Sequence, residues 1–241
     1  MLRAHGPAHY DFVMLDGPSR PSVQGMRNFL RRGPPPRASW LIAGVMPLLA
    51  GLLTLTMSLS ALSAPWPNYR LNGGVGGRHF WNDPAMINPV YAGTVRDAMS
   101  TWNGVGLISF TETFSMCCDS QIDAYAMAYG NTPWYGITEF RASNGTLLQT
   151  SEAGPPIANW DFANVGLNDT YLRDPVVFDT AQKIQGIAAH EIGHALGLAH
   201  EDDPGHNCQL MDVSLVASWQ TPCGTIYTPR TWDRQWAAQL P

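Results

Sequence analysis

We expect residues 64–241 to form a single α+β domain behind an N-terminal leader of residues 1–63. The chain has 241 residues, of which 45% are hydrophobic and 14% are charged, and this composition suits one sizeable hydrophobic core. Segments with strand or helix patterns follow one another in the order strand, helix, several strands, helix. That order is compatible with an α+β domain without specifying one fold. A histidine motif near the C-terminal end, described below, reduces the number of α+β folds that the sequence allows.

The leader has the pattern of an export signal. Its first part carries several arginines and a run of three prolines at 34–36, and it lacks helical periodicity. Residues 40–62 contain no charge, and small residues surround Ala64. A basic flank, an apolar run and small residues are typical of a signal peptide. A start at Met26 would give this signal an ordinary length, so translation from Met1 or from Met26 stays open.

The apolar run 40–62 also admits a second interpretation, an uncleaved membrane anchor, because 23 apolar residues can span a bilayer. Pro47 and the polar Thr and Ser residues in the second half of the run favour cleavage. Both interpretations place the folded part outside the cytoplasm, secreted or anchored. Contact with a membrane is then expected only through residues 40–62.

The charge of the folded part excludes several classes of partner. From Ala64 onward there are 8 Lys and Arg against 17 Asp and Glu, a net charge of −9. A surface of this sign repels phosphate backbones and anionic lipids. We therefore expect no binding of nucleic acid, and no binding of membrane surfaces by the domain itself.

All four cysteines follow Ala64, namely Cys117, Cys118, Cys208 and Cys223, and an even number is consistent with two disulfides in an exported protein. We favour the pair Cys208–Cys223, which closes a loop of about 15 residues worth roughly 3 kcal/mol in the chain-entropy model. A vicinal Cys117–Cys118 bridge then remains. Cross-pairing and four reduced thiols are the alternatives.

The coarse pattern of the domain predicts two helices that matter for the site and several strands around them. Asn88 and Pro89 open a helix that continues to about Trp102, and Asp179 is a good N-cap for a second helix that runs to Gly197. Alternating or short apolar runs predict strands late in 68–83 and over 107–113, 123–129, 134–140 and about 163–171, and a last helix over 229–240.

The motif His190-Glu191-x-x-His194-x-x-Gly197-x-x-His200 points to a metal site. His190 and His194 are four residues apart, so on a helix both imidazoles lie on one face and can share a metal ion. On a continued helix, His200 would lie about 9 Å farther along the axis than His194, out of reach of the same metal ion. The chain must therefore turn back, and Gly197 can adopt the left-handed conformation that such a turn needs.

Three imidazoles leave a fourth tetrahedral position for water, as in catalytic zinc sites. Glu191, next to the first ligand, can accept a proton from that water and act as the general base. The alternative is a buried helix that carries histidines by chance. The rarity of the complete motif argues against this alternative.

These residues resemble the zinc signature of the metzincin metallopeptidases, most closely the matrixin-like branch, with Met211 in the place of the methionine turn. The resemblance implies a zincin fold: a twisted, mostly parallel mixed sheet, an active-site helix and a C-terminal helix. It also implies one catalytic zinc ion, Met211 as an apolar floor beneath the imidazoles, and a protein or peptide substrate bound extended along the edge strand of the sheet. We expect a monomer.

The chain also departs from the matrixin pattern. Met211 lies farther from His200 than is usual, because residues 201–208 lengthen the loop, and no tyrosine ligand follows the turn. No cysteine precedes Cys117, so a cysteine-switch prodomain cannot operate. We expect His206 to be a loop residue and not a ligand. The acidic pair Asp202 and Asp203 could bind Ca²⁺ or prefer basic substrates, although a solvated charge run is the simpler interpretation.

The sequence therefore predicts a secreted zinc endopeptidase. Three alternatives remain at this point: a non-catalytic zinc-binding extracellular module, a membrane-anchored form of the same peptidase, and a zinc hydrolase that acts on a non-peptide amide. The substrate and the route of activation do not follow from the sequence.

Overall fold

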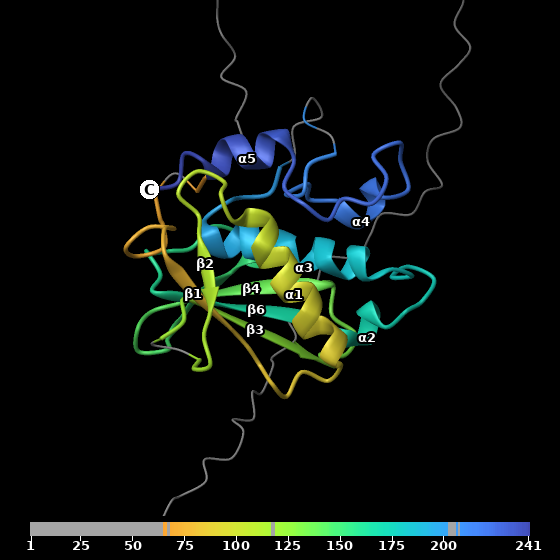
Figure 1. Cartoon of the computed structure of the whole chain (residues 1–241), viewed down its shortest axis with the longest axis horizontal. Coiled ribbons are helices and arrows are strands. Elements are labelled where there is room, and N and C mark those ends of the chain that lie inside the picture. Colours follow the sequence, from red (N-terminus) through yellow and green to blue (C-terminus); the bar gives the residue numbers. More distant parts are fainter. Residues whose placement is uncertain (1–64, 67, 117–118, 202–205, 207) are drawn as a thin grey trace, which may run out of the picture. The chain divides into compact units, whose positions relative to one another are not determined.

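Six strands of the computed structural model form one mixed sheet in the order β2-β1-β3-β6-β4-β5 (Figure 1). Their bounds are Arg78–Asn82 for β1, Phe110–Glu112 for β2, Ile122–Met127 for β3, Gly136–Arg141 for β4, Leu147–Thr150 for β5 and Phe162–Asn168 for β6. Strand β1 runs parallel to β2 and β3, and β3 runs parallel to β6. The pairs β6–β4 and β4–β5 are antiparallel. The mixed, mostly parallel sheet expected from the resemblance is thus confirmed.

The structure describes residues 65–66, 68–116, 119–201, 206 and 208–241. The expected leader, the Cys117–Cys118 bridge and the acidic pair at 202–203 lie outside these residues, and the boundary at Ala64 stays a prediction. Within the described ranges, no helix combines the length and apolar character that crossing a membrane would require.

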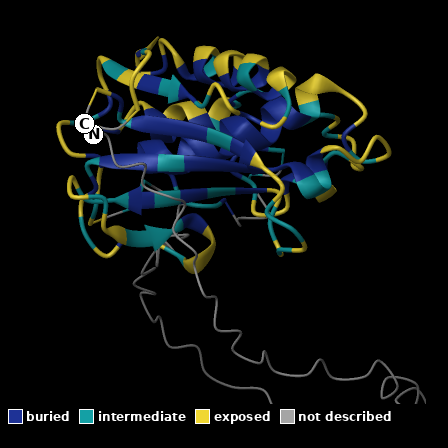
Figure 2. Ribbon diagram, turned by 90° about the horizontal axis from the view of Figure 1, so that it is seen from below, coloured by how far each residue is buried: buried dark blue, intermediate teal, exposed yellow. Residues whose placement is uncertain are grey.

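Two long helices pack against the sheet and against each other (Figure 1). Helix α1 spans Pro89–Trp102, and the side chain of Asn88 caps it by accepting a hydrogen bond from the Val90 amide. Helix α3 spans Ala181–Leu196 and is buried along almost its whole length, because it contacts β4, β6 and α1. Buried positions gather on the strands and the helix surfaces that face them, whereas exposed ones lie on outer surfaces and loops (Figure 2).

Two fully buried tryptophans tie the core to α3. The Trp102 indole N–H donates to the carbonyl of Ala189 at 3.0 Å, and the Trp160 indole N–H donates to the carbonyl of Ala195 at 3.1 Å. A buried indole N–H needs an acceptor, and carbonyl oxygens of the helix provide one. The helix that carries the motif is thereby fixed from two sides.

The start of α3 differs from the sequence prediction. Thr180, not Asp179, is the residue before the first helical turn, and no side-chain cap is found there. Asp179 instead forms an ion pair with Lys183, four residues later, in which Oδ1 of Asp179 lies 3.0 Å from Nζ of Lys183. An ion pair across the first turn replaced the cap that we expected. The helix ends as predicted, with Gly197 in the left-handed region at φ 116°.

Several other boundaries also moved. The strand expected over 107–113 is only Phe110–Glu112, since turns at Gly104 and Gly106, both with positive φ, precede it. Strand β6 ends at Asn168, whose side chain accepts from the Thr170 amide and starts the short helix α2 (Asp169–Leu172). Strand β5 was not predicted, because its side chains are half-exposed and do not alternate clearly.

The C-terminal region contains two short helices, α4 (Leu215–Ser218) and α5 (Thr231–Ala237), so the last helix is shorter than the predicted 229–240. The disulfide Cys208–Cys223 is present, with the two Cα atoms 5.3 Å apart. It closes the segment that carries Met211 and α4, as the sequence predicted.

Candidate metal centre

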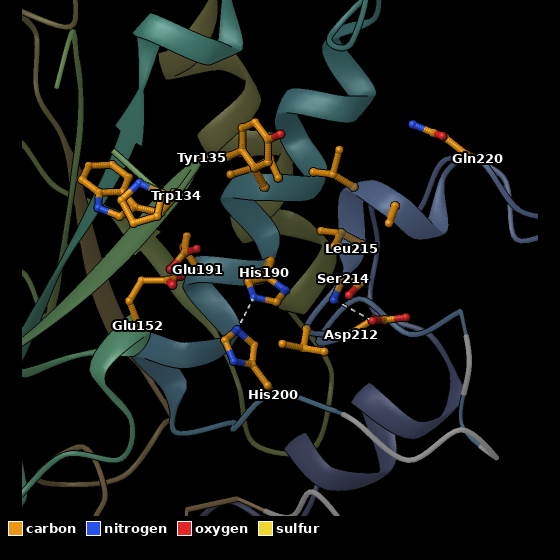
Figure 3. Close-up of a pocket in the computed structure, with 16 residues that line it drawn as sticks. Trp134, Tyr135, Glu152, His190, Glu191, His200, Asp212, Ser214, Leu215 and Gln220 are labelled. Atoms are coloured by element: carbon orange, nitrogen blue, oxygen red, sulfur yellow. Dashed lines mark hydrogen bonds between the residues drawn. The ribbon is translucent and has the colours of Figure 1, made fainter. Parts of the chain in front are cut away.

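The three histidines of the motif meet at one point. The Nε2 atom of His194 lies 3.1 Å from Nε2 of His190 and 3.1 Å from Nε2 of His200, and the last two atoms are 3.2 Å apart. Figure 3 shows His190 and His200 facing each other across the site. The helix spacing therefore places the first two imidazoles, and the turn after α3 returns the third.

Gly197 makes that return. Its amide donates to the carbonyls of His194 at 2.9 Å and Gly193 at 3.2 Å, and the Leu198 amide donates to Gly193 at 2.9 Å. These bonds satisfy the last carbonyls of the helix while the chain leaves its axis, as in a Schellman-type end. The left-handed φ that this end requires would be strained for any residue with a Cβ.

Backbone carbonyls orient two of the rings. Nδ1 of His190 donates to the carbonyl of Leu210 at 2.7 Å, and Nδ1 of His194 donates to the carbonyl of Leu198 at 2.8 Å. With the proton on Nδ1, the lone pair of each ring lies on Nε2, where the three atoms converge. The Trp66 ring stacks on the His194 ring with 5.7 Å between centroids and 7° between planes.

The donor set fits a zinc ion. Zinc binds imidazole nitrogen at about 2.0–2.1 Å, and tetrahedral geometry then separates neighbouring nitrogens by roughly 3.3 Å, close to the spacing observed here. Burial, with the nearby charge of His200, lowers the pKa of His190 to about 3, and burial lowers the pKa of His194 as well. Both rings are thus neutral, as ligands must be. In the described part of the chain, this is the one group of three or more such side chains able to bind a metal.

Glu191 is buried beside the histidines and is held by two hydroxyl groups. Thr138 Oγ1 lies 2.9 Å from Glu191 Oε2 and 2.8 Å from the Glu191 carbonyl, and Ser151 Oγ lies 3.3 Å from Oε2. Burial raises the pKa of Glu191 to about 8, while the Thr138 hydrogen bond opposes the rise. Gly136 passes close over this side chain, since a Cβ there would lie 2.7 Å from Glu191 Cγ.

Met211 is fully buried and lies against Gly193 of α3. A Cβ at Gly193 would collide with the Met211 sulfur, so this position of the motif must lack a side chain. The carboxylate of Asp233, at the start of α5, accepts the amides of Leu210 at 2.7 Å and Met211 at 3.1 Å. Because the Leu210 carbonyl also orients His190, Asp233 supports both His190 and the loop that contains Leu210 and Met211, here called the methionine loop.

A cavity of about 470 Å³ opens over the metal centre (Figure 3). It is lined by Pro133, Trp134, Tyr135, Gly136, Glu152, Ile187, His190, Glu191, His200, Asp212, Val213, Ser214, Leu215, Val216, Ala217 and Gln220. Residues of α4 form one side, and Glu152 lies on the other, with His190 and Glu191 between them (Figure 3). His190, Glu191 and His200 therefore line a cavity that a substrate could enter.

His206 is not one of the three ligands. Its Nδ1 lies 3.2 Å from Oε2 of the buried Glu201, and its ring packs on Trp232 with 4.1 Å between centroids. The sequence prediction of a loop residue near the site agrees with this placement.

Four residues that contact the site were missed by sequence reasoning: Trp66, Thr138, Ser151 and Asp233. All four lie far from the motif in sequence, so no local pattern connects them with it. Asp233 offered one signal, because it stands three residues after Arg230 and accepts the Arg230 amide at 2.8 Å as an N3 capping residue does.

Comparison with known proteins identifies the family of this chain. The matrixin peptidase family model matches residues 80–213. Human neutrophil collagenase is 30% identical over 112 residues, which are 46% of this chain and 21% of the collagenase, so the chain spans about a fifth of that relative. The structure of myroilysin is similar with a TM-score of 0.41 and 13% identity over 73% of this chain and 96% of that one. Since the family model covers more than half of the chain, the protein belongs to the matrixin family of zinc metallopeptidases.

Proposed function

We propose that this protein is an exported zinc endopeptidase in which Glu191 is the general base. The observation that carries the proposal is the convergence of three imidazoles beside one hydroxyl-bound carboxylate, with His190, His200 and Glu191 lining a single open cavity. Non-catalytic zinc sites use their ligands to close the coordination sphere, whereas this one faces a space that a substrate can occupy.

His190, His194 and His200 would hold the metal through their Nε2 atoms. When bound, zinc supplies Lewis acidity, which polarises a carbonyl and makes a nearby water more acidic. The protein's own contribution is to keep the His190 and His194 rings neutral through burial, which lowers the pKa of each, and to aim them through the carbonyls of Leu210 and Leu198. A fixed ligand geometry keeps the remaining position open for the reaction.

Glu191 moves the proton. Both hydroxyl groups that hold its carboxylate contact Oε2, so we assign Oε1 to proton transfer. Glu191 takes a proton from the attacking water and later gives it to the departing amine of the cleaved bond. Burial raises the pKa of Glu191, which favours uptake of the proton, while the hydrogen bonds from Thr138 and Ser151 stabilise the carboxylate that remains when the proton is given up.

We propose that the substrate is a protein or peptide segment that lies extended in the cavity, as expected for this family. Export is supported by the Cys208–Cys223 disulfide, because disulfides persist in oxidising compartments. It is also supported by the signal-like pattern of residues 40–62. N-terminal sequencing of the mature protein tests this part: a first residue near Ala64 indicates a secreted form, and retention of 40–62 indicates an anchored one.

The experiment that tests the function compares Glu191→Ala and Glu191→Gln with the unaltered protein on a broad peptide library, with zinc content measured on each sample. We expect zinc to stay bound in all three proteins, while hydrolysis falls by orders of magnitude in both variants. Equal hydrolysis by all three would contradict the assigned role of Glu191. If the zinc-loaded unaltered protein cleaves no peptide and no unfolded protein, the site is a non-catalytic zinc-binding module instead.

A further inference from the structure

The hairpin of β4 and β5 covers one end of the sheet edge that borders the cavity. Backbone groups of successive residues in a strand point to opposite neighbours. In β4 the carbonyl of Arg141 accepts from Asp161, and just before the strand the Tyr135 carbonyl accepts from Asn168, so odd-numbered residues face β6 and even-numbered residues face outward. Strand β5 pairs with β4 from Glu139 to Arg141.

The outward amide of Thr138 is also occupied, because it donates to Ser151 Oγ at 3.0 Å. Gly136, which lines the cavity, is thus the β4 residue whose outward backbone groups face the cavity and not β5 or Ser151. A substrate that pairs with this edge can do so at Gly136, whereas at Thr138 the outward amide is already bonded and β5 covers the residues that follow. On the Glu152 side of the cavity, the edge therefore accommodates only a short piece of substrate.

Glu152 stands at this closed end. The preceding residue, Ser151, is 4% exposed and its hydroxyl contacts both the Thr138 amide and Glu191, so the backbone next to Glu152 is firmly placed. The Glu152 side chain lines the cavity and lies beside Glu191 in Figure 3. A carboxylate therefore lines the cavity close enough to Glu191 for the two groups to interact electrostatically.

Nothing in the cavity wall neutralises this carboxylate. No lysine or arginine is among the cavity-lining residues. In the part of the chain that the structure describes, Glu152 forms no ion pair. Apart from Glu191, the wall contains one further acid, Asp212, and it differs because its carboxylate accepts the Ser214 amide at 2.8 Å and the Ser218 hydroxyl at 2.7 Å. Glu152 is open to solvent, yet partial burial of its carboxyl group still raises the pKa of that group.

We propose that Glu152 is a specificity-determining residue that binds a cationic group of the substrate, an ammonium or a guanidinium, close to the bond that is cleaved. The assignment rests on the proposed function and names a substrate class for it: peptides with a positive charge within a residue or two of the cleaved bond. The charge can come from a lysine or arginine side chain or from the α-amine of a peptide. The net charge of −9 after Ala64 favours the approach of such substrates.

The first test measures binding without hydrolysis. Hydroxamates bind zinc, so their affinity for the zinc-loaded protein can be measured by calorimetry. We compare three compounds: Nα-acetyl-lysine hydroxamate, which carries a side-chain cation, alanine hydroxamate, which carries an α-amine, and Nα-acetyl-alanine hydroxamate, which is neutral. We expect one cationic compound to bind roughly two- to fivefold more tightly than the neutral one at low salt, the size of a solvent-exposed ion pair. The compound that gains affinity identifies the source of the charge. The gain should shrink as salt is added.

The matched variants are Glu152→Gln, which removes the charge from the cavity, and Asp97→Asn, which removes one from the exposed surface of α1. The preference should disappear in the first variant and persist in the second. Equal binding of cationic and neutral compounds, failure of all three to bind a protein that contains zinc, or an unchanged preference in Glu152→Gln would each overturn the proposal.

The second test uses the peptide library with free or acetylated α-amines. The unaltered protein should enrich a positive charge at a fixed position beside the cleaved bond, and Glu152→Gln should lose this enrichment while still cleaving. Cleavage with identical preferences in both proteins refutes the role of Glu152 and leaves the peptidase function intact. If the protein prefers the cationic hydroxamate but cleaves no peptide, the role of Glu152 in binding a cation stands and the peptidase function is refuted.

Discussion

The histidine segment 190–200 and the segments that support it contribute to the same metal centre in different ways. The segment holds all three ligands and Glu191 within eleven consecutive residues, so helix geometry and one turn place them. The supports come from Trp66, Thr138 and Asp233, which are far from the segment in sequence and reach it only through the fold. The short segment provides the reactive groups, and the distant residues fix their orientation.

This difference separates two kinds of failure. Loss of a ligand should remove the metal, because three neutral nitrogens are the minimum that holds a catalytic zinc. Loss of a support should leave the metal in place but weaken or misalign it, since residues around metal ligands typically change affinity or activity by 10–100-fold. Variants in the two groups can therefore be distinguished by zinc content, stability and rate.

The largest effect is expected for a ligand. His194→Ala should lose zinc after dialysis and lose peptide hydrolysis by several orders of magnitude, because His194 is fully buried between the other two rings. Metal analysis and a peptide assay measure the two losses. His206→Ala is the matched control, since His206 lies near the site but contacts Glu201 and Trp232. Comparable zinc loss in both variants would contradict the ligand set.

Asp233→Ala should give the largest effect among the supports. The buried carboxylate accepts three backbone amides, including those of Leu210 and Met211, and its removal leaves them without partners. We expect the free energy of unfolding to fall by about 2–4 kcal/mol, measured by urea denaturation, and zinc affinity to fall with it.

Asp169→Ala is the control for this prediction. Asp169 is also buried and accepts a hydrogen bond from the Tyr91 hydroxyl at 2.6 Å, but it belongs to α2 and does not contact the methionine loop. Its loss should lower stability while zinc affinity stays the same. If Asp233→Ala keeps full zinc affinity in competition with a chelator, Asp233 contributes to folding alone.

A smaller effect is expected for Trp66, which lies outside the segment matched by the family model. Its ring stacks on His194 and its amide donates to the Gly197 carbonyl at 2.9 Å, so it limits rotation of the ligand. Trp66→Ala should weaken zinc binding about tenfold, as measured by chelator competition. Trp232→Ala removes a half-buried tryptophan that does not contact a ligand, and it should change zinc affinity little. Equal affinities in the two variants would exclude a positioning role.

The division between local and distant residues also explains what the sequence could predict. The ligands, the end of α3 at Gly197 and the Cys208–Cys223 disulfide follow from spacing, backbone preference and loop length, and the structure contains the helix end and the disulfide as expected. The order of strands and helices was predicted with errors at their ends. Those errors arose where a side chain redirected the backbone, as Asn168 does at the end of β6.

The residues that hold Glu191 could not be predicted in this way. Thr138 and Ser151 become neighbours of Glu191 only because β4 lies beside α3 and β5 returns along β4, and β5 itself has little alternation to reveal it. A hydroxyl in a strand is common and carries no sign of its partner. Pairing between distant strands is thus the information that the sequence pattern lacks.

Thr138→Val tests the supporting residue that lies closest to the proposed chemistry. Valine keeps the shape but removes the hydroxyl that contacts Glu191 Oε2 at 2.9 Å, in a position that is fully buried. A hydrogen bond to a charged group contributes about 1.5–3 kcal/mol, so kcat should fall roughly tenfold or more. Thr138 contacts Glu191, the proposed general base, so its loss should act on the proton-transfer step. We therefore expect KM and zinc content to change little.

Thr94→Val provides the comparison, since Thr94 is buried in α1 and its hydroxyl bonds only to the Tyr91 carbonyl at 2.9 Å. Both variants lose a buried hydroxyl and should lose similar stability, but only Thr138→Val should lower kcat. A fall in kcat of equal size in both would mean that stability, and not the orientation of Glu191, limits the rate. A fall confined to Thr138→Val would show that β4 contributes to catalysis through the carboxylate it holds.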